Sequence, residues 1–125
     1  MKVIIAGSRD FKDFEKVWTH MDKLPWEVTE VVCGGARGAD RLGERWAKEN
    51  AIPVKYFYPD WNHEGRGAGY RRNEEMAKYA DCLVAFDMGT KGTAHMIACA
   101  KHYGLGCYIV HIKPKPYFPF FHVFF

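Results

Sequence analysis

The sequence predicts an α/β fold in which helices cover both faces of a doubly wound, mainly parallel sheet of five strands. Short apolar runs alternate along the chain with stretches whose apolar residues recur at helical spacing. Right-handed crossovers through the intervening helices make such strands parallel. The strands are nearly continuous apolar runs, as is typical of strands that helices bury on both faces. Three of them end in small, polar or basic loops that lead into helices.

Length and composition limit the class of protein. A chain of 125 residues, with 48% hydrophobic and 26% charged residues, is expected to form one globular domain. A net charge of +3 permits an anionic ligand but is too small for a dedicated nucleic-acid binder. The first residues show no signal-peptide pattern, and no apolar stretch reaches the roughly 20 residues that cross a bilayer. We therefore expect a cytoplasmic protein without membrane contact.

The four cysteines fall inside predicted strands or a helix and show no C-x-x-C spacing, so we interpret them as reduced core residues. The histidines do not supply zinc-ligand spacings, and His63 beside Glu64 is a weak metal signal. A G-x-G-x-x-G sequence with a later acidic residue is absent after the first strand. We expect no metal ion and no cofactor.

The first elements follow directly from the apolar pattern. Residues 2–6 form the first expected strand. Apolar residues then recur at helical spacing from Phe11 to Leu24, with Asp10 as candidate N-cap and Pro25 just beyond the end.

The second strand is expected at residues 29–33 and the third at 53–57. The helix between them ends near Asn50, a candidate left-handed cap. Its apolar face consists of Ala39, Leu42, Gly43, Trp46 and Ala47.

The second half of the chain continues the alternation. Residues 58–69 form a loop that is too long for a mere connection, followed by a helix over 70–80, a strand over 82–86, a helix over 92–103 and a strand over 106–112. The inward face of the first of these helices consists of Asn73, Met76, Ala77 and Ala80.

We predict a single domain over residues 1–112 and a Pro/Phe-rich C-terminal segment over 113–125. Residues 117–125 contain five phenylalanines and one tyrosine, a composition that favours burial against another surface. This segment packs on its own domain, forms a homo-oligomer interface or captures a partner; we expect a homo-oligomer.

The loop after the second strand is the strongest indication of function. Gly34, Gly35 and Gly38 allow the backbone to approach a phosphate at a helix N-terminus, and Arg37 offers a planar guanidinium to it. Asp40 either binds a ribose hydroxyl or caps the helix.

Two further loops have the same form. In an open α/β sheet the ligand crevice lies outside the carboxyl ends of the strands, so all three loops are expected to face one crevice. The additional candidate ligand residues are Gly7, Ser8 and Arg9 after the first strand, and Gly89, Thr90, Gly92 and Thr93 after the fourth.

The helix after the long loop adds Arg72 and Asn73 to the candidate ligand residues. Within that loop, Trp61 is either a base-stacking platform or a plug over the core. The weak candidates for acid–base catalysis are Asp40, Asp87 and His95.

Four motifs in order resemble the SLOG superfamily, which includes the DNA-processing protein A (SMF) proteins and the Lonely Guy nucleotide hydrolases. They are Gly7-Ser8-Arg9, the run from Gly34 to Asp40, the run from Gly69 to Asn73, and the run from Gly92 to Met96. The chain is most similar to the small YspA-like domains, from Met1 to about Ile112. The resemblance implies a Rossmann-like sheet that binds a nucleotide-derived ligand, in a bacterial or phage setting.

One position departs from this pattern. In the Lonely Guy enzymes the second loop reads P-G-G-x-G-T-x-x-E, and its glutamate takes part in cleaving the N-glycosidic bond. Here Gly92 and Thr93 are retained, but Met96 occupies the position of that glutamate. A thioether can neither accept a proton nor stabilise an oxocarbenium ion as a carboxylate does.

Three functions remain open at this point. The favoured one is a domain that senses, sequesters or processes a small nucleotide derivative, of ADP-ribose or nucleoside-monophosphate type. The second is a nucleotide N-glycosidic phosphoribohydrolase, which Met96 disfavours. The third is single-stranded nucleic-acid binding, which the modest net charge disfavours.

Overall fold

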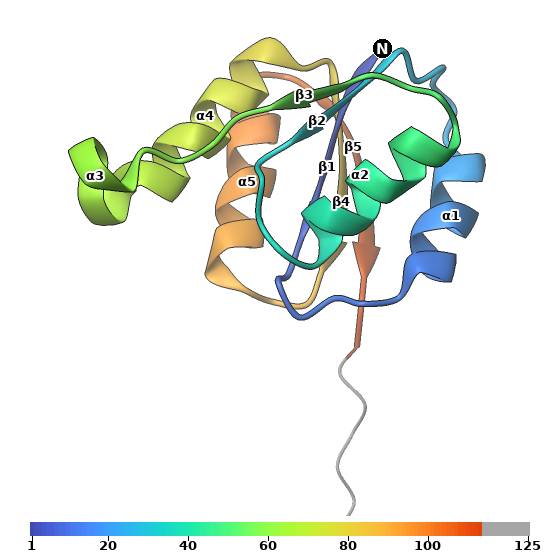
Figure 1. Ribbon diagram of the computed structural model, residues 1–125, viewed down its shortest axis with the longest axis horizontal. Coiled ribbons are helices and arrows are strands. Elements are labelled where there is room, and N and C mark those ends of the chain that lie inside the picture. The colour runs from blue at the N-terminus through green and yellow to red at the C-terminus, as the bar shows by residue number, and fades with distance from the viewer. Residues whose placement is uncertain (114–125) are drawn as a thin grey trace, which may run out of the picture.

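A computed structural model describes residues 1–113, which form a five-stranded sheet between two layers of helices (Figure 1). The strands lie in the order β3-β2-β1-β4-β5, and every neighbouring pair is parallel. Their bounds are Lys2–Gly7 for β1, Glu30–Cys33 for β2, Val54–Tyr56 for β3, Cys82–Asp87 for β4 and Gly106–His111 for β5. The predicted doubly wound α/β fold is confirmed, and its sheet is wholly parallel.

Two helices cover each face of the sheet. Helices α1 (Phe14–Asp22) and α2 (Ala39–Glu49) lie on one face, and α4 (Ala68–Tyr79) and α5 (Lys91–His102) lie on the other (Figure 1). The segment predicted as a long loop contains the short helix α3 (Trp61–Glu64) and a 3-10 turn, η1 (Gly65–Gly67).

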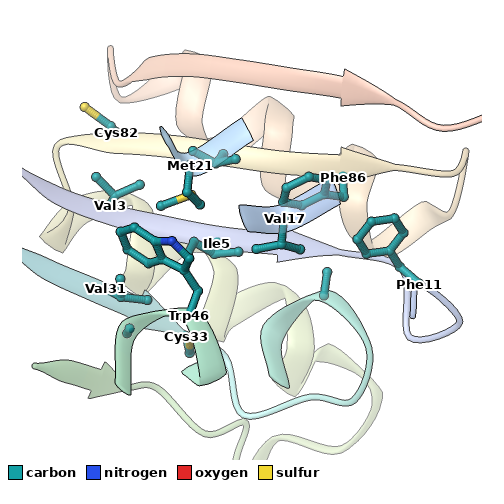
Figure 2. Packing of buried hydrophobic residues seen from close by; sticks show 13 residues of the cluster. Val3, Ile5, Phe11, Val17, Met21, Val31, Cys33, Trp46, Cys82 and Phe86 are labelled. Atoms are coloured by element: carbon teal, nitrogen blue, oxygen red, sulfur yellow. The ribbon is translucent and has the colours of Figure 1, made fainter. Parts of the chain in front are cut away.

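The core has two layers because alternate residues of each strand point to opposite faces. On the α1 and α2 side, Val3 and Ile5 pack with Val17 and Trp46 (Figure 2). At the carboxyl end of this layer Phe11 stacks on Phe86, with ring centroids 4.9 Å apart. The layer on the other side contains Ile4, Val32, Leu83, Met76 and Met96.

The start of α1 differs from the prediction. Asp13, rather than Asp10, caps the helix, and its carboxylate accepts a hydrogen bond from the Lys16 amide at 3.0 Å. The residues between Ser8 and α1 form a turn. In it the Ser8 carbonyl accepts a hydrogen bond from the Phe11 amide, and the Ser8 hydroxyl accepts one from the Asp10 amide. The helical spacing of apolar residues therefore begins in this turn, before the first residue of α1.

The end of α2 also differs from the prediction. Asn50 has a φ of −103°, and the left-handed residue is Ala51, with a φ of 56°. The Asn50 amide group instead donates to the Trp46 carbonyl at 2.8 Å. Asn50 therefore closes the helix with its side chain.

The topology determines where a ligand crevice can lie. The chain runs outward from β1 to β2 and β3, and then returns to β4 on the other side of β1. The strand order thus reverses between β1 and β4, and ligands of open α/β sheets bind outside the carboxyl ends of the strands at such a point. Within residues 1–113 no helix is long and apolar enough to cross a membrane. The aromatic-rich residues 117–125 lie outside the described range.

Candidate functional site

A crevice of about 330 Å³ lies at the carboxyl ends of β1 and β4. It brings together residues from all three predicted loops and from α4. The predicted ligand residues in its lining are Gly7, Ser8, Arg9, Asp40, Arg72, Asn73, Thr90, Gly92 and Thr93.

The remaining predicted residues lie beside this crevice. Gly34, Gly35 and Arg37 line an adjoining second crevice of about 350 Å³, which shares Arg9, Ala36 and Arg72 with the first. Gly38 lines a third pocket, which is basic, together with Arg37 and Arg41. The two crevices and this pocket are called the three hollows below. Gly89 lines none of the three, and its amide donates to Asp87 at 2.8 Å.

The loops after β1 and β2 are packed backbone to backbone. Gly38 has a φ of 73° and a ψ of −127°, a conformation essentially restricted to glycine. A Cβ at this position would collide with the carbonyl of Ser8. That carbonyl also accepts from the amide of Ala39, the first residue of α2. Gly38 is therefore needed for the contact between two loops that flank the crevice.

Asp40 holds the Gly-rich loop in its shape. Its carboxylate accepts hydrogen bonds from the amides of Gly34 at 3.1 Å and Ala36 at 3.3 Å. The side chain is buried, and burial raises the pKa of Asp40; Arg72, the two amides and Arg9 oppose this effect. The predicted capping of α2 by Asp40 is wrong, because Gly38 occupies the N-cap position and the Asp40 carboxylate bonds the loop amides instead. Its predicted binding of a ribose hydroxyl stays a prediction.

Arg72 connects α4 to the same loop. Its guanidinium donates to the Gly34 carbonyl and, at 3.0 Å, to the Asn73 side chain. Burial lowers the pKa of Arg72, and the nearby Asp40 opposes this effect. Arg72 is thus held in place by protein contacts before any ligand arrives.

The N-terminus of α5 also lines the first crevice. Thr90 occupies the N-cap position, but its hydroxyl donates to the Thr93 hydroxyl at 3.0 Å and does not accept from a helix amide. The first turn of α5 contains no acidic residue. A helix N-terminus with uncapped amides attracts anions. The crevice that it faces contains two arginines, Arg9 and Arg72, and two aspartates, Asp10 and the buried Asp40.

The other candidate catalytic groups lie outside the lining of the three hollows. Asp87 binds the Gly89 amide and lies 3.4 Å from the His111 ring. His95 contacts the side chain of Asn73 at 3.1 Å and packs on Tyr70. Their catalytic roles stay predictions. Met96 lines the first crevice and is 1% exposed, so a thioether forms part of its floor.

Reasoning from the sequence missed Tyr58, which lines the second crevice with Trp61. Tyr58 lies two residues after the end of β3, so the rule that ligands bind at the carboxyl ends of strands could have found it. It also missed Met76, which lines the first crevice from α4. Met76 was predicted to face the core. In the structure it packs in the core and also lines the crevice.

Two comparisons relate the chain to known proteins. Residues 1–63 match the YspA, cpYpsA-related SLOG family. Gene 61 protein of Mycobacterium phage D29 is 35% identical over 126 aligned positions, which cover 92% of this chain and 98% of the phage protein. The second similarity extends over nearly the whole of both chains and includes the segments that carry α4 and α5.

Proposed function

Because this chain belongs to the YspA, cpYpsA-related SLOG family, whose membership suggests a nucleotide-related function, we propose that it binds a small nucleotide derivative in the first crevice. The ligand is of ADP-ribose or nucleoside-monophosphate type. Binding serves sensing or sequestration of this ligand.

One observation carries the proposal: the uncapped N-terminus of α5 and the positioned Arg72 line the same crevice. Helix amides and a guanidinium are the groups that bind phosphate oxygens. The hydroxyls of Thr90 and Thr93 and the amide of Asn73 add polar groups suited to a sugar.

Hydrolysis by the Lonely Guy route is not part of this proposal. Met96 lines the crevice where the resemblance places the glutamate of those enzymes. We therefore expect the protein to bind AMP without releasing adenine, as followed by chromatography of the incubated nucleotide. Release of adenine that Asp40→Asn abolishes would favour the phosphoribohydrolase instead.

The test is calorimetric titration with AMP and ADP-ribose at low salt, comparing the wild-type protein with Arg9→Gln. Arg9 lines the crevice but is exposed and makes no ion pair within residues 1–113, so we expect its replacement to leave the fold intact, with a higher pKa of Asp40. Loss of one charged hydrogen bond should weaken binding about 10-fold or more.

Arg66→Gln is the matched control, because Arg66 is exposed and lines none of the three hollows. It should bind both nucleotides as the wild type does. No binding of either nucleotide at millimolar concentration would refute the proposal. Tight binding of short single-stranded DNA that weakens steeply with salt, and that both arginine variants reduce, would favour the nucleic-acid alternative.

A further inference from the structure

The second crevice combines exposed aromatic rings with positive charge. Its charged groups are Arg9, Arg37 and Arg72, and its lining contains no carboxylate. Tyr58 and Trp61 provide its aromatic surface. It opens beside the first crevice and shares Arg9 and Arg72 with it, so one ligand can contact both.

Tyr58 is held in position but not buried. Its ring stacks on Tyr56, with centroids 5.6 Å apart and planes 5° from parallel. The same ring lies against Gly35, where a Cβ would collide with it. Tyr58 nevertheless remains 68% exposed. Neighbours thus fix the ring while most of its surface stays available.

Trp61 is positioned in a comparable way. It begins α3, which Asp60 caps by accepting from the His63 amide at 3.2 Å. The tip of its ring lies close to Gly69, the second residue of α4. Trp61 is 50% exposed and belongs to neither core cluster, so it does not plug the core.

We propose that Tyr58 and Trp61 form the base-binding subsite of this protein, an inference that rests on the proposed function. The phosphate of the nucleotide lies in the first crevice with Arg9 and Arg72, and the base stacks on the two rings in the second. Stacking on an aromatic ring uses the π-face that every base has, so purine and pyrimidine nucleotides both bind. Purines bind more tightly because their faces are larger.

The test separates the base from the phosphate. Calorimetry compares AMP, UMP and ribose 5-phosphate, which lacks a base, on the wild type, Trp61→Ala and Trp61→Phe. Stacking of one base corresponds to a roughly 5- to 150-fold preference for AMP over ribose 5-phosphate. We expect Trp61→Ala to reduce this ratio toward one without changing the affinity for ribose 5-phosphate. Trp61→Phe should retain most of the ratio.

Tyr103→Ala is the control for loss of an exposed aromatic residue. Tyr103 is 41% exposed at the end of α5 and lines none of the three hollows. It should keep the wild-type ratio. Circular dichroism and the melting temperature show that each variant is folded.

Failure of the subsite differs from failure of the proposed function. If ribose 5-phosphate binds and AMP binds no more tightly, or if Trp61→Ala leaves the ratio unchanged, the subsite is wrong and the phosphate site stands. If neither AMP nor ADP-ribose binds, the proposed function fails and the subsite fails with it. An oligonucleotide could also bind more than 100-fold more tightly than AMP and lose this affinity in Trp61→Ala. The two rings would then stack on the bases of a nucleic-acid strand, and the mononucleotide subsite would be overturned.

Discussion

At the scale of single residues, the conformation of the Gly-rich loop after β2 and the charge of the Asp40 carboxylate depend on each other. This carboxylate is buried, accepts hydrogen bonds from two loop amides and lies beside the half-buried guanidinium of Arg72. Burial penalises the charged form of a carboxylate unless partners compensate for the lost water. The loop that is proposed to approach a phosphate is therefore organised around a group that binds its proton more tightly than usual.

Asp40→Asn tests this property through pH. Burial raises the pKa of Asp40 in the folded chain above its unfolded value of roughly 4. Below the unfolded pKa both states are protonated, and the contribution of Asp40 to stability is complete. As pH rises toward the folded pKa, the unfolded chain loses its proton first, so the free energy of unfolding falls by up to about 1.4 kcal/mol per pH unit.

Asparagine does not titrate, and its amide oxygen can still accept from the amides of Gly34 and Ala36. Urea denaturation between pH 4 and pH 7 should therefore show the wild type losing stability relative to Asp40→Asn as pH rises. A difference that grows in favour of the wild type would mean that Arg72 and the amides outweigh burial, and that the pKa of Asp40 is lowered.

Gly38→Ala tests the contact between the loops after β1 and β2. The substitution combines a backbone conformation that alanine avoids with a collision against Ser8. We expect a loss of at least about 1–3 kcal/mol in the free energy of unfolding by urea. In Gly67→Ala the added Cβ meets open space and φ is −78°, so this control should lose no stability. Equal effects of the two substitutions would contradict the close packing at Gly38.

The residue scale also shows what sequence patterns can predict. Glycines after apolar runs located the loops, because both the turn and the close approach require the absence of a side chain. The partners of Asp40 were not predictable in this way. The contact between Arg72 and Gly34 joins residues 38 positions apart, and only the packing of α4 brings them together.

At the scale of elements, α2 lies unusually close to the sheet. Gly43 faces β1, and a Cβ there would lie 2.6 Å from Cγ2 of Ile5. Since α2 begins at the Gly-rich loop, its distance from the sheet also sets the position of that loop. Gly43 therefore acts on the site through the placement of a whole helix.

A double-mutant cycle tests this placement. Gly43→Ala should destabilise the protein by about 1–3 kcal/mol, because overpacking forces the helix away from the strand. Ile5→Ala removes Cγ2 and Cδ1 but keeps the Cβ that lies 2.7 Å from the new Cβ. The added cost of Gly43→Ala should therefore shrink in that background, by about 0.5 kcal/mol, without vanishing. Ile4 points into the opposite core layer, so Gly43→Ala should keep its full cost on top of Ile4→Ala. Absence of coupling to Ile5 would place the strain elsewhere.

The elements differ in how well they could be predicted. All five strands and the four long helices followed from their apolar patterns. Burial explains this for β1, β2 and β4, whereas the edge strands β3 and β5 contain no fully buried residue. Helix α3 was missed, since it has four residues and none of them is buried. The start of α1 was misplaced because Phe11 continues the apolar period while lying in a turn.

At the scale of the whole molecule, assembly between copies stays a prediction based on residues 117–125. Five phenylalanines in nine residues favour association, so we expect light scattering of the full chain to give a multiple of its 14.4 kDa mass. The double variant Phe120→Ser, Phe121→Ser should shift the mass toward the monomer and leave AMP binding unchanged. A monomeric wild-type chain would contradict this expectation.

Because the strand order reverses between β1 and β4, the crevice exists only where both halves of the chain are folded against each other. Its walls come from residues before β3 on one side and after α3 on the other, so neither half of the chain contains the complete site. A ligand that contacts both walls connects the two halves of the chain across the β1–β4 strand pair. It can bind only after the two halves have folded against each other, and it then slows their separation. Bound nucleotide should therefore slow unfolding far more than it speeds folding. Amide exchange should fall most at the hydrogen bonds that join these two strands.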